Sequence, residues 1–295
     1  VVILGMKVLL FGSSGWIGGL LQPILAERKI ECVPAKSRLE NFGDVARELD
    51  EIKPTHVFNA AGLTGRPNVD WCDQHKDQTV RVNVIGTLNL YDSCAQRNVH
   101  LTNFSSGCIY RYDESYPEGS AARKETDPPN FTGSFYSKTK GMVEKLVSVY
   151  PNSLTLRLRM PLSDDLHHRS LLTKLAKYPK IMGNVLNSVS VLSDLLPVSV
   201  SMATRGCTGV YNFTNPGAVC HSTILDLYKQ HIDPSYSFES FQPDDPLFCT
   251  LMATRSNCEL DSSKLLKEFP EVPHVDVALP LLFQRIKGNL AKQKE

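Results

Sequence analysis

Apolar residues in this chain fall into short continuous runs, separated by longer segments in which the apolar positions have helical spacing. A short continuous apolar run is typical of a strand that is buried on both faces of a sheet. The runs predict strands at 8–11, 30–35, 55–62, 101–105, 154–158 and 209–213, and the spaced segments predict helices at 17–25, 69–97 and 135–150. Because helical segments separate the strands, the pattern predicts an α/β fold with a doubly wound parallel sheet.

The two ends of the chain differ in pattern. After about Met160, prolines and short irregular segments become more frequent. We therefore predict a sheet domain over residues 1–160, to which a later strand around 208–214 returns, and a smaller C-terminal lobe over 161–295. The apolar stretch Val1–Leu4 is either native or an addition, and Met6 is the expected start of the chain.

Composition excludes several classes of function. The 295 residues are 42% hydrophobic, which suffices for a full core. A net charge of +1 with dispersed basic residues indicates neither nucleic-acid nor membrane binding, and no apolar run approaches the roughly 20 residues of a membrane span. The eight cysteines lack metal-binding spacing, so we expect reduced thiols in a cytosolic protein without a metal. The expected partner is a small neutral or anionic metabolite.

A glycine-rich segment directly follows the first predicted strand. Glycines at 12, 15 and 18 allow a tight turn, a close backbone approach to a pyrophosphate and close helix–strand packing. A plain turn is the alternative, but the position between a buried strand and a helix favours phosphate binding. The residues predicted to bind the cofactor are Gly12, Ser13, Ser14, Gly15, Trp16, Ile17 and Gly18.

The second predicted strand ends without a carboxylate. In NAD enzymes an Asp or Glu at this point binds the ribose hydroxyls. Ser37 and Arg38 stand there instead, and both can bind a 2′-phosphate. The sequence therefore predicts NADPH rather than NADH. The alternative is that Arg38 is a solvated surface cation.

Tyr136 and Lys140 lie four residues apart, on one face of a predicted helix. The pKa of a tyrosine is about 10 in water, so catalysis near neutral pH needs a cation such as Lys140 to stabilise the phenolate. Ser106, at the end of a predicted strand, can donate a second hydrogen bond to a substrate carbonyl while hydride arrives. A Tyr-x-x-x-Lys pair alone is also common on an exposed helical face.

Further segments make the chain resemble a known family. The chain resembles the extended short-chain dehydrogenase/reductase family over most of its length. This resemblance rests on the groups above together with Asn59, Ala60, Ala61, Gly62 and Asn83. Segments 15–19, 64–72, 129–138, 158–161, 211–217 and 255–257 look more specifically like the plant-type nucleotide-rhamnose synthase/epimerase-reductase. This resemblance implies a Rossmann-type NADP-binding domain, a lobe for the nucleotide sugar, and a homodimer. It also implies a bifunctional enzyme that converts UDP-4-keto-6-deoxy-glucose, supplied by another protein, to UDP-rhamnose with NADPH.

Cys108 suggests a second chemistry at the same site. Inversion at the two carbons beside the C4 ketone needs a base on one face and an acid on the other. A cysteine, with a pKa of about 8.5, can act as either near neutrality. Lys174, in a predicted helix at 170–178, is the candidate opposing group, and the resemblance implies the same pair. His167 and His168 are alternatives to Lys174, and a buried structural thiol is the alternative for Cys108.

Other residues are candidates for the nucleotide sugar. Arg255 is a candidate diphosphate ligand, because a guanidinium can bind phosphate with two parallel hydrogen bonds. The resemblance suggests Arg66, Asn130 and Asn257 as further contacts, and Phe131 either lines the pocket or belongs to the core. A 4-ketosugar reductase without epimerase activity and a non-catalytic NADP-binding subunit are the alternative functions. The base, uracil or thymine, and the order of inversion at C3 and C5 stay open.

Overall fold

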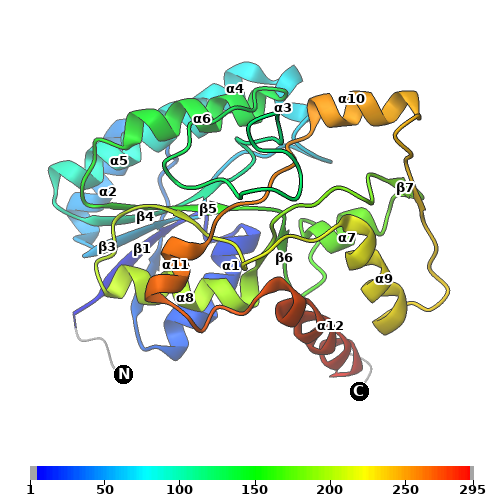
Figure 1. Cartoon of the computed structure of the whole chain (residues 1–295). Coiled ribbons are helices and arrows are strands. Elements are labelled where there is room, and N and C mark those ends of the chain that lie inside the picture. Colours follow the sequence, from blue (N-terminus) through cyan, green and yellow to red (C-terminus); the bar gives the residue numbers. More distant parts are fainter. Residues whose placement is uncertain (1–4, 293–295) are drawn as a thin grey trace. The chain divides into compact units, whose positions relative to one another are not determined.

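A computed structural model describes residues 5–292, so the segment Val1–Leu4 lies outside the described residues. Six strands form one sheet in the order β2-β1-β3-β4-β5-β9 (Figure 1). Strand β1 pairs in parallel with β2 and β3, and β3 pairs in parallel with β4. The doubly wound α/β prediction is confirmed. The strands are β1 (Lys7–Phe11), β2 (Glu31–Pro34), β3 (His56–Asn59), β4 (His100–Ser106), β5 (Ser153–Leu158) and β9 (Gly209–Asn212).

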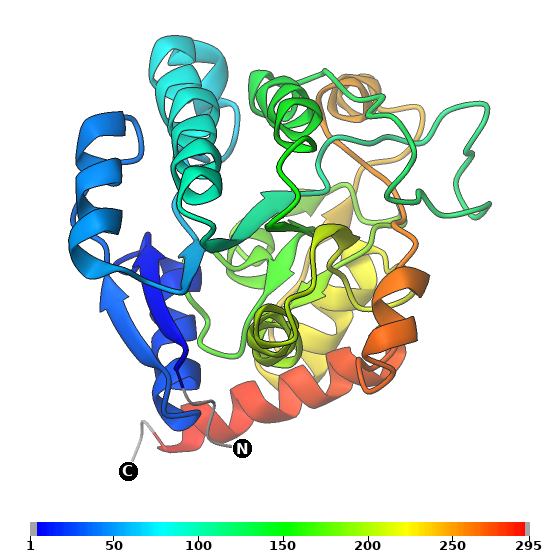
Figure 2. The ribbon, with the colours of Figure 1, turned by 90° about the vertical axis from the view of Figure 1, so that its left-hand side faces the viewer.

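Helices cover both faces of this sheet. Helices α2 (Phe42–Ile52), α5 (Thr87–Gln96) and α6 (Phe135–Val147) lie side by side on one face, and α1 (Trp16–Glu27) lies on the other (Figures 1 and 2). Apolar side chains of β1, β3 and β4 pack against α2, α5 and α6 to form a buried core, which includes Leu9, Val45, Val57, Leu90, Leu101 and Val143. Leu9, Val57 and Leu101 belong to predicted strands. Leu90 and Val143 belong to predicted helices, whereas Val45 lies on α2, which the sequence pattern did not predict.

The chain divides into two compact units. The first contains the residues up to Ile109, Phe131–Arg157 and Leu196–Tyr211, and the second contains Tyr110–Asn130, Leu158–Leu195 and the residues from Asn212 onward. The segment 110–130 thus belongs to the second unit and the segment 196–211 to the first. Helix α8 (Leu192–Thr204) begins in the second unit and continues into the first.

The second unit contains short elements around its own core. Its elements are β6 (Pro161–Leu162), α7 (Leu171–Leu175), β7 (Lys180–Ile181), β8 (Ser190–Val191), α9 (His221–His231), β10 (Glu239–Ser240), α10 (Pro246–Thr254), α11 (Ser263–Glu268) and α12 (Val275–Lys292). Leu162, Leu172, Val191, Ile224 and Phe283 are buried together in this core. Helix α7 is shorter than the predicted 170–178, because Pro179 disfavours a helical conformation at the residue before it.

The predicted helix at 69–97 is divided into four segments. These are α3 (Trp71–Gln74), α4 (Lys76–Val80), a π-helical segment η1 (Arg81–Gly86) and α5. His75 leaves the helical conformation, with φ −128° and ψ 55°. In η1, Asn83 is buried, and a Cβ on Gly86 would lie 2.7 Å from the Cβ of Leu39. The interruption therefore follows from tertiary contacts, and π-helical turns are frequent at functional sites.

Candidate active site

The glycine turn between β1 and α1 has no room for a side chain at Gly12 or Gly18. Gly12 has a φ of +74°, and a Cβ there would lie 2.6 Å from the backbone nitrogen of Ala61. A Cβ on Gly18 would collide with the carbonyl oxygen of Gly12, and Gly15 donates a backbone hydrogen bond to that oxygen at 2.9 Å. The turn therefore presents bare backbone at the start of α1, as a bound pyrophosphate requires.

A second backbone turn lies against the first. Asn59 ends β3, and its Oδ1 accepts a hydrogen bond from the Ala61 backbone at 3.0 Å. The Asn83 side chain holds Leu63, the residue after Gly62, with two hydrogen bonds. It accepts from the Leu63 N–H at 2.8 Å and donates to the Leu63 carbonyl at 2.7 Å. The structure thus brings the predicted cofactor residues 12–18, 59–62 and 83 to one edge of the sheet.

Ser37 and Arg38 follow β2, and both are bonded to carboxylates. The Ser37 hydroxyl donates to Glu48 at 2.5 Å, and the Arg38 guanidinium pairs with Glu40 at 3.1 Å. The Arg38 side chain is 72% exposed. Glu48 comes from α2, and no local sequence pattern indicates this contact.

Helix α6 places Tyr136 and Lys140 on one face, with the Lys140 nitrogen 5.8 Å from the centre of the Tyr136 ring. Ser134 caps the helix by accepting from the Ser137 N–H at 3.1 Å. A second cap comes from α3, because the Asp73 carboxylate accepts from the Phe135 N–H at 3.1 Å. The sequence analysis missed Asp73, since a cap supplied by a distant helix leaves no local pattern.

Ser106, Cys108 and Tyr136 interact with one another. Tyr136 is 7% exposed, and this burial raises its pKa above the ordinary value. A Cys108 thiolate raises it further, whereas a hydrogen bond with Ser106 lowers it. The Ser106 hydroxyl also accepts from the Cys108 N–H at 3.1 Å. Tyr136 is therefore protonated at neutral pH, and it can donate a proton to a carbonyl oxygen held between it and Ser106.

Lys140 is a partly buried cation beside the two backbone turns. Its nitrogen would lie 3.9 Å from a Cβ on Gly62. Burial lowers the pKa of Lys140 to about 8, although the charges of Cys72 and Glu144 act in the opposite direction. Glu144 itself is held by Arg157 of β5, whose Nε lies 3.1 and 3.0 Å from the two carboxylate oxygens. Arg157 and Glu144 therefore form a buried ion pair next to Lys140.

The predicted substrate residues are divided between the two units. Arg66 is exposed and Phe131 is buried in the first unit, which also holds Ser106, Cys108, Tyr136 and Lys140. Asn130 belongs to the second unit, where its amide bonds to Asp113 at 2.5 Å. The second unit also contains Lys174 on α7, His167 and His168 before α7, Arg255 at the end of α10, and the buried Asn257.

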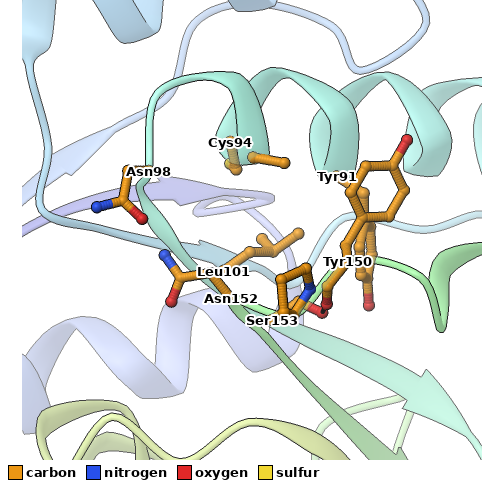
Figure 3. A pocket seen from close by; sticks show the side chains of 9 residues that line it. Tyr91, Cys94, Asn98, Leu101, Tyr150, Asn152 and Ser153 are labelled. Atoms are coloured by element: carbon orange, nitrogen blue, oxygen red, sulfur yellow. Dashed lines mark hydrogen bonds between the residues drawn. The ribbon is translucent and has the colours of Figure 1, made fainter.

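A shallow pocket of about 120 Å³ lies elsewhere in the first unit (Figure 3). Its lining includes Leu101 near the start of β4 and Ser153 at the start of β5, with Tyr91, Cys94 and Tyr150. None of the predicted site residues lines it. Parallel strands carry ligand sites at their carboxyl ends, and Ser106 lies at that end of β4. Among residues 5–292, no cluster of His, Cys, Asp and Glu could hold a metal, and no helix could cross a membrane.

Comparison with known proteins identifies the family. Residues 6–177 match the family described as RmlD substrate binding domain. The chain belongs to this family. A bifunctional dTDP-4-dehydrorhamnose 3,5-epimerase/dTDP-4-dehydrorhamnose reductase of Arabidopsis thaliana is 48% identical to this member, over 92% of this chain and 90% of the relative. This relative thus matches almost the whole chain.

Longer relatives and solved structures agree with this assignment. A trifunctional UDP-glucose 4,6-dehydratase/UDP-4-keto-6-deoxy-D-glucose 3,5-epimerase/UDP-4-keto-L-rhamnose-reductase of Arabidopsis thaliana is 49% identical over 93% of this RmlD-family chain, which spans only 41% of that relative. The crystal structure of a UDP-rhamnose synthase from Acanthamoeba polyphaga mimivirus superposes with a TM-score of 0.89 at 34% identity, over 95% of this chain and 99% of the other. A Bacillus anthracis dTDP-4-dehydrorhamnose reductase in complex with NADP, at 15% identity and a TM-score of 0.77, shares the fold.

Proposed function

We propose that this chain is a bifunctional 3,5-epimerase/4-reductase that converts UDP-4-keto-6-deoxy-glucose to UDP-L-rhamnose with NADPH. The observation that carries the proposal is the interaction of Cys108 with Tyr136 and Ser106. These side chains supply a proton-transfer thiol next to two donors for a carbonyl oxygen. The epimerase and reductase activities for which the two Arabidopsis thaliana relatives are named support the same pair of reactions.

The described residues fit a bound dinucleotide. Bare backbone at Gly12 and Gly18 accommodates the pyrophosphate, and the turn at 59–62 lies against it. Lys140 and Asn83 lie beside Gly62, on the side from which the ribose and nicotinamide are held in our proposal. Ser37 and Arg38 are the groups for the 2′-phosphate. NADPH, when bound, supplies the hydride for C4 of the sugar.

Reduction uses Tyr136 as the general acid. Its hydroxyl is protonated at neutral pH because burial raises its pKa, so it has a proton to give as charge develops on the C4 oxygen. Ser106 donates a second hydrogen bond to the same oxygen. Lys140, with a pKa of about 8, is mostly charged at neutral pH and stabilises the phenolate that remains.

Epimerisation uses the same two donors and a separate acid–base pair. Tyr136 and Ser106 stabilise the enolate oxygen that forms when a proton leaves C3 or C5. Cys108 transfers protons on one face of the sugar, and Lys174 acts on the other. The nucleotide diphosphate binds Arg255, with Arg66, Asn130, Phe131 and Asn257 as further contacts. We also propose that the protein is cytosolic and forms a homodimer.

The decisive experiment is an NMR analysis of the sugar formed from UDP-4-keto-6-deoxy-glucose and NADPH in deuterated water. UDP-rhamnose with deuterium at C3 and C5 is the expected product, because each inversion exchanges a carbon-bound proton with solvent. An uninverted 6-deoxy sugar without deuterium would reduce the protein to a 4-ketosugar reductase. Absence of any turnover would leave a non-catalytic NADP-binding protein.

A further inference from the structure

A carboxylate from α2 reaches the end of β2, where the strand itself has none. Glu48 Oε1 accepts a hydrogen bond from the Lys36 N–H at 2.7 Å. Its Oε2 accepts from the Ser37 N–H at 2.9 Å and from the Ser37 hydroxyl at 2.5 Å. A carboxylate at the end of this strand is the feature by which NAD enzymes bind the ribose hydroxyls. Glu48 therefore supplies, from the next helix, the charge that the sequence of the strand lacks.

Contacts that do not involve Glu48 also hold the loop after β2. The Ala35 N–H donates to the Leu10 carbonyl at 2.9 Å, which extends the pairing of β2 with β1. Leu39 is 4% exposed and belongs to the core, and the Asn89 side chain donates to its carbonyl at 3.0 Å. Replacement of Glu48 should therefore change the charge at this point while the loop keeps its position.

The charges around the loop oppose one another. Arg38 is paired with Glu40, and Ser37 is bonded to Glu48, so both predicted 2′-phosphate ligands already contact a carboxylate. A phosphate monoester carries roughly −1.5 to −2 charges at neutral pH. It must compete with Glu40 for Arg38 and is repelled by Glu48. A ribose 2′-hydroxyl is neutral and can donate a hydrogen bond to a carboxylate, so it meets no such repulsion.

We propose that Glu48 is a specificity-determining residue that reduces the preference of this protein for NADPH over NADH. The proposal rests on the proposed use of NADPH. Arg38 attracts the 2′-phosphate and Glu48 repels it, so the ratio of the two affinities reflects the balance of these charges. Glu48 also orients the Lys36 and Ser37 N–H groups through its hydrogen bonds.

The test is a fluorescence titration of the purified chain with NADPH and with NADH, which yields both dissociation constants without turnover. Glu48→Gln removes the charge, Glu48→Asp keeps it, and Glu51→Gln is a matched control at an exposed position of α2. In Glu48→Gln the ratio Kd(NADH)/Kd(NADPH) should rise about five- to tenfold, mainly through tighter NADPH binding, as expected when one nearby like charge is removed at a partly solvated site. Glu48→Asp and Glu51→Gln should stay within about twofold of the wild-type ratio.

Three results would overturn the role of Glu48. Equal weakening of both dinucleotides in Glu48→Gln would mean that Glu48 only holds the loop. An unchanged ratio would mean that its charge does not reach the 2′ position. An equal rise in Glu48→Asp would assign the effect to side-chain length rather than charge. Failure of the wild-type protein to bind either dinucleotide would instead contradict the proposed function itself.

Discussion

Ser106, Cys108 and Tyr136 share one electrostatic environment, so the protonation state of each group affects the others. Burial raises the pKa of Tyr136, and a charged Cys108 raises it further. A thiolate at Cys108 thus keeps the tyrosine protonated. In our proposal this thiolate takes a carbon-bound proton and becomes a neutral thiol, while Tyr136 keeps the proton that it later gives to the C4 oxygen. At this scale, the proposed chemistry depends on a few side chains whose contributions can be separated.

Cys108→Ser should abolish most of the epimerase activity and spare the reductase activity. A general acid–base group typically contributes about 10² to 10⁴ in rate, so deuterium incorporation at C3 and C5 should slow by that factor. Reduction of an already inverted 4-keto-rhamnose substrate should stay within about threefold, because Ser106 and Tyr136 remain. NMR follows the exchange, and NADPH absorbance follows the reduction. Cys249→Ser, at an exposed position of α10, is the control. Equal losses in both reactions would contradict separate roles.

The reductase activity should fall as the pH rises through about 8. Lys140 loses its charge there, since burial lowers its pKa to about 8, and the phenolate of Tyr136 then lacks its cation. The kcat/KM for the inverted substrate reports this ionisation in the free enzyme. Lys140→Arg, with a guanidinium charged at all these pH values, should remove the alkaline decline. A decline that persists in the arginine variant would assign it to another group.

The same ionisation affects folding with a defined sign. Between pH 8 and the ordinary lysine pKa of about 10.4, the unfolded chain binds a proton at Lys140 that the folded protein has lost. The contribution of Lys140 to the free energy of unfolding therefore rises with pH across this window.

At the scale of elements, the start of α6 determines where Tyr136 lies. Tyr136 is the second residue of the helix, so fraying of the first turn would move it. Two caps act there, Ser134 from the preceding residue and Asp73 from α3. Lys76 of α4 adds a contact, with its nitrogen 5.7 Å from the centre of the Phe135 ring. The interrupted helical segment at 71–86 thus orients α6, which carries the proposed general acid Tyr136.

Asp73→Ala should lower kcat for reduction about tenfold, because loss of a helix cap costs about 0.5–2 kcal/mol and frees the first turn. The dissociation constant for NADPH should change little, since the glycine turn is untouched and Lys140 lies beyond the first turn of α6. Asp73→Asn keeps an oxygen acceptor for the Phe135 N–H and should restore most of kcat. Asp77→Ala, at an exposed position of α4, is the control. Failure of the asparagine variant to restore kcat would contradict a positioning role.

At the scale of the whole molecule, the first compact unit holds the proposed cofactor and reductase groups, and the second holds Lys174 and Arg255. The bifunctional proposal therefore requires groups from both units. The first unit also carries an apolar stripe, formed by Met142, Leu146 and Val149, whose exposed fractions are 54%, 53% and 74%. Exposed apolar patches on a folded protein often mark an interface, and in our proposal a second copy of the chain covers this one.

The purified wild-type protein should therefore have the mass of a dimer in light scattering after size exclusion. Leu146→Lys should yield monomers, because it places a charge in the centre of the stripe that the second copy covers in our proposal. Val277→Lys, at a similarly exposed apolar position of α12, should leave the dimer intact. A monomeric wild-type protein would contradict the homodimer proposal, as would a Leu146→Lys variant that stays dimeric.

The sequence by itself determined the strands of the sheet and the two backbone turns that we propose to bind the cofactor. Each strand of the sheet was predicted from an apolar run. Gly12 and Gly18 stand where a side chain would collide with backbone, so the glycine spacing was enough to predict the turn. Tyr136 and Lys140 were likewise predictable, because their spacing matches one turn of a helix. These features depend on neighbours in the chain, and such features are visible in a sequence.

Only the tertiary structure decided which distant groups act on these residues. Glu48 reaches Ser37 from another helix, Asp73 caps α6 across 62 residues, and Asn83 turns inward from a π-helical segment to hold Leu63. Each contact depends on how helices pack over the sheet, and hydrogen bonds between distant residues leave no periodic signal. The pKa values of Tyr136 and Lys140 shift for the same reason, because burial is a property of the packed fold and not of the local sequence.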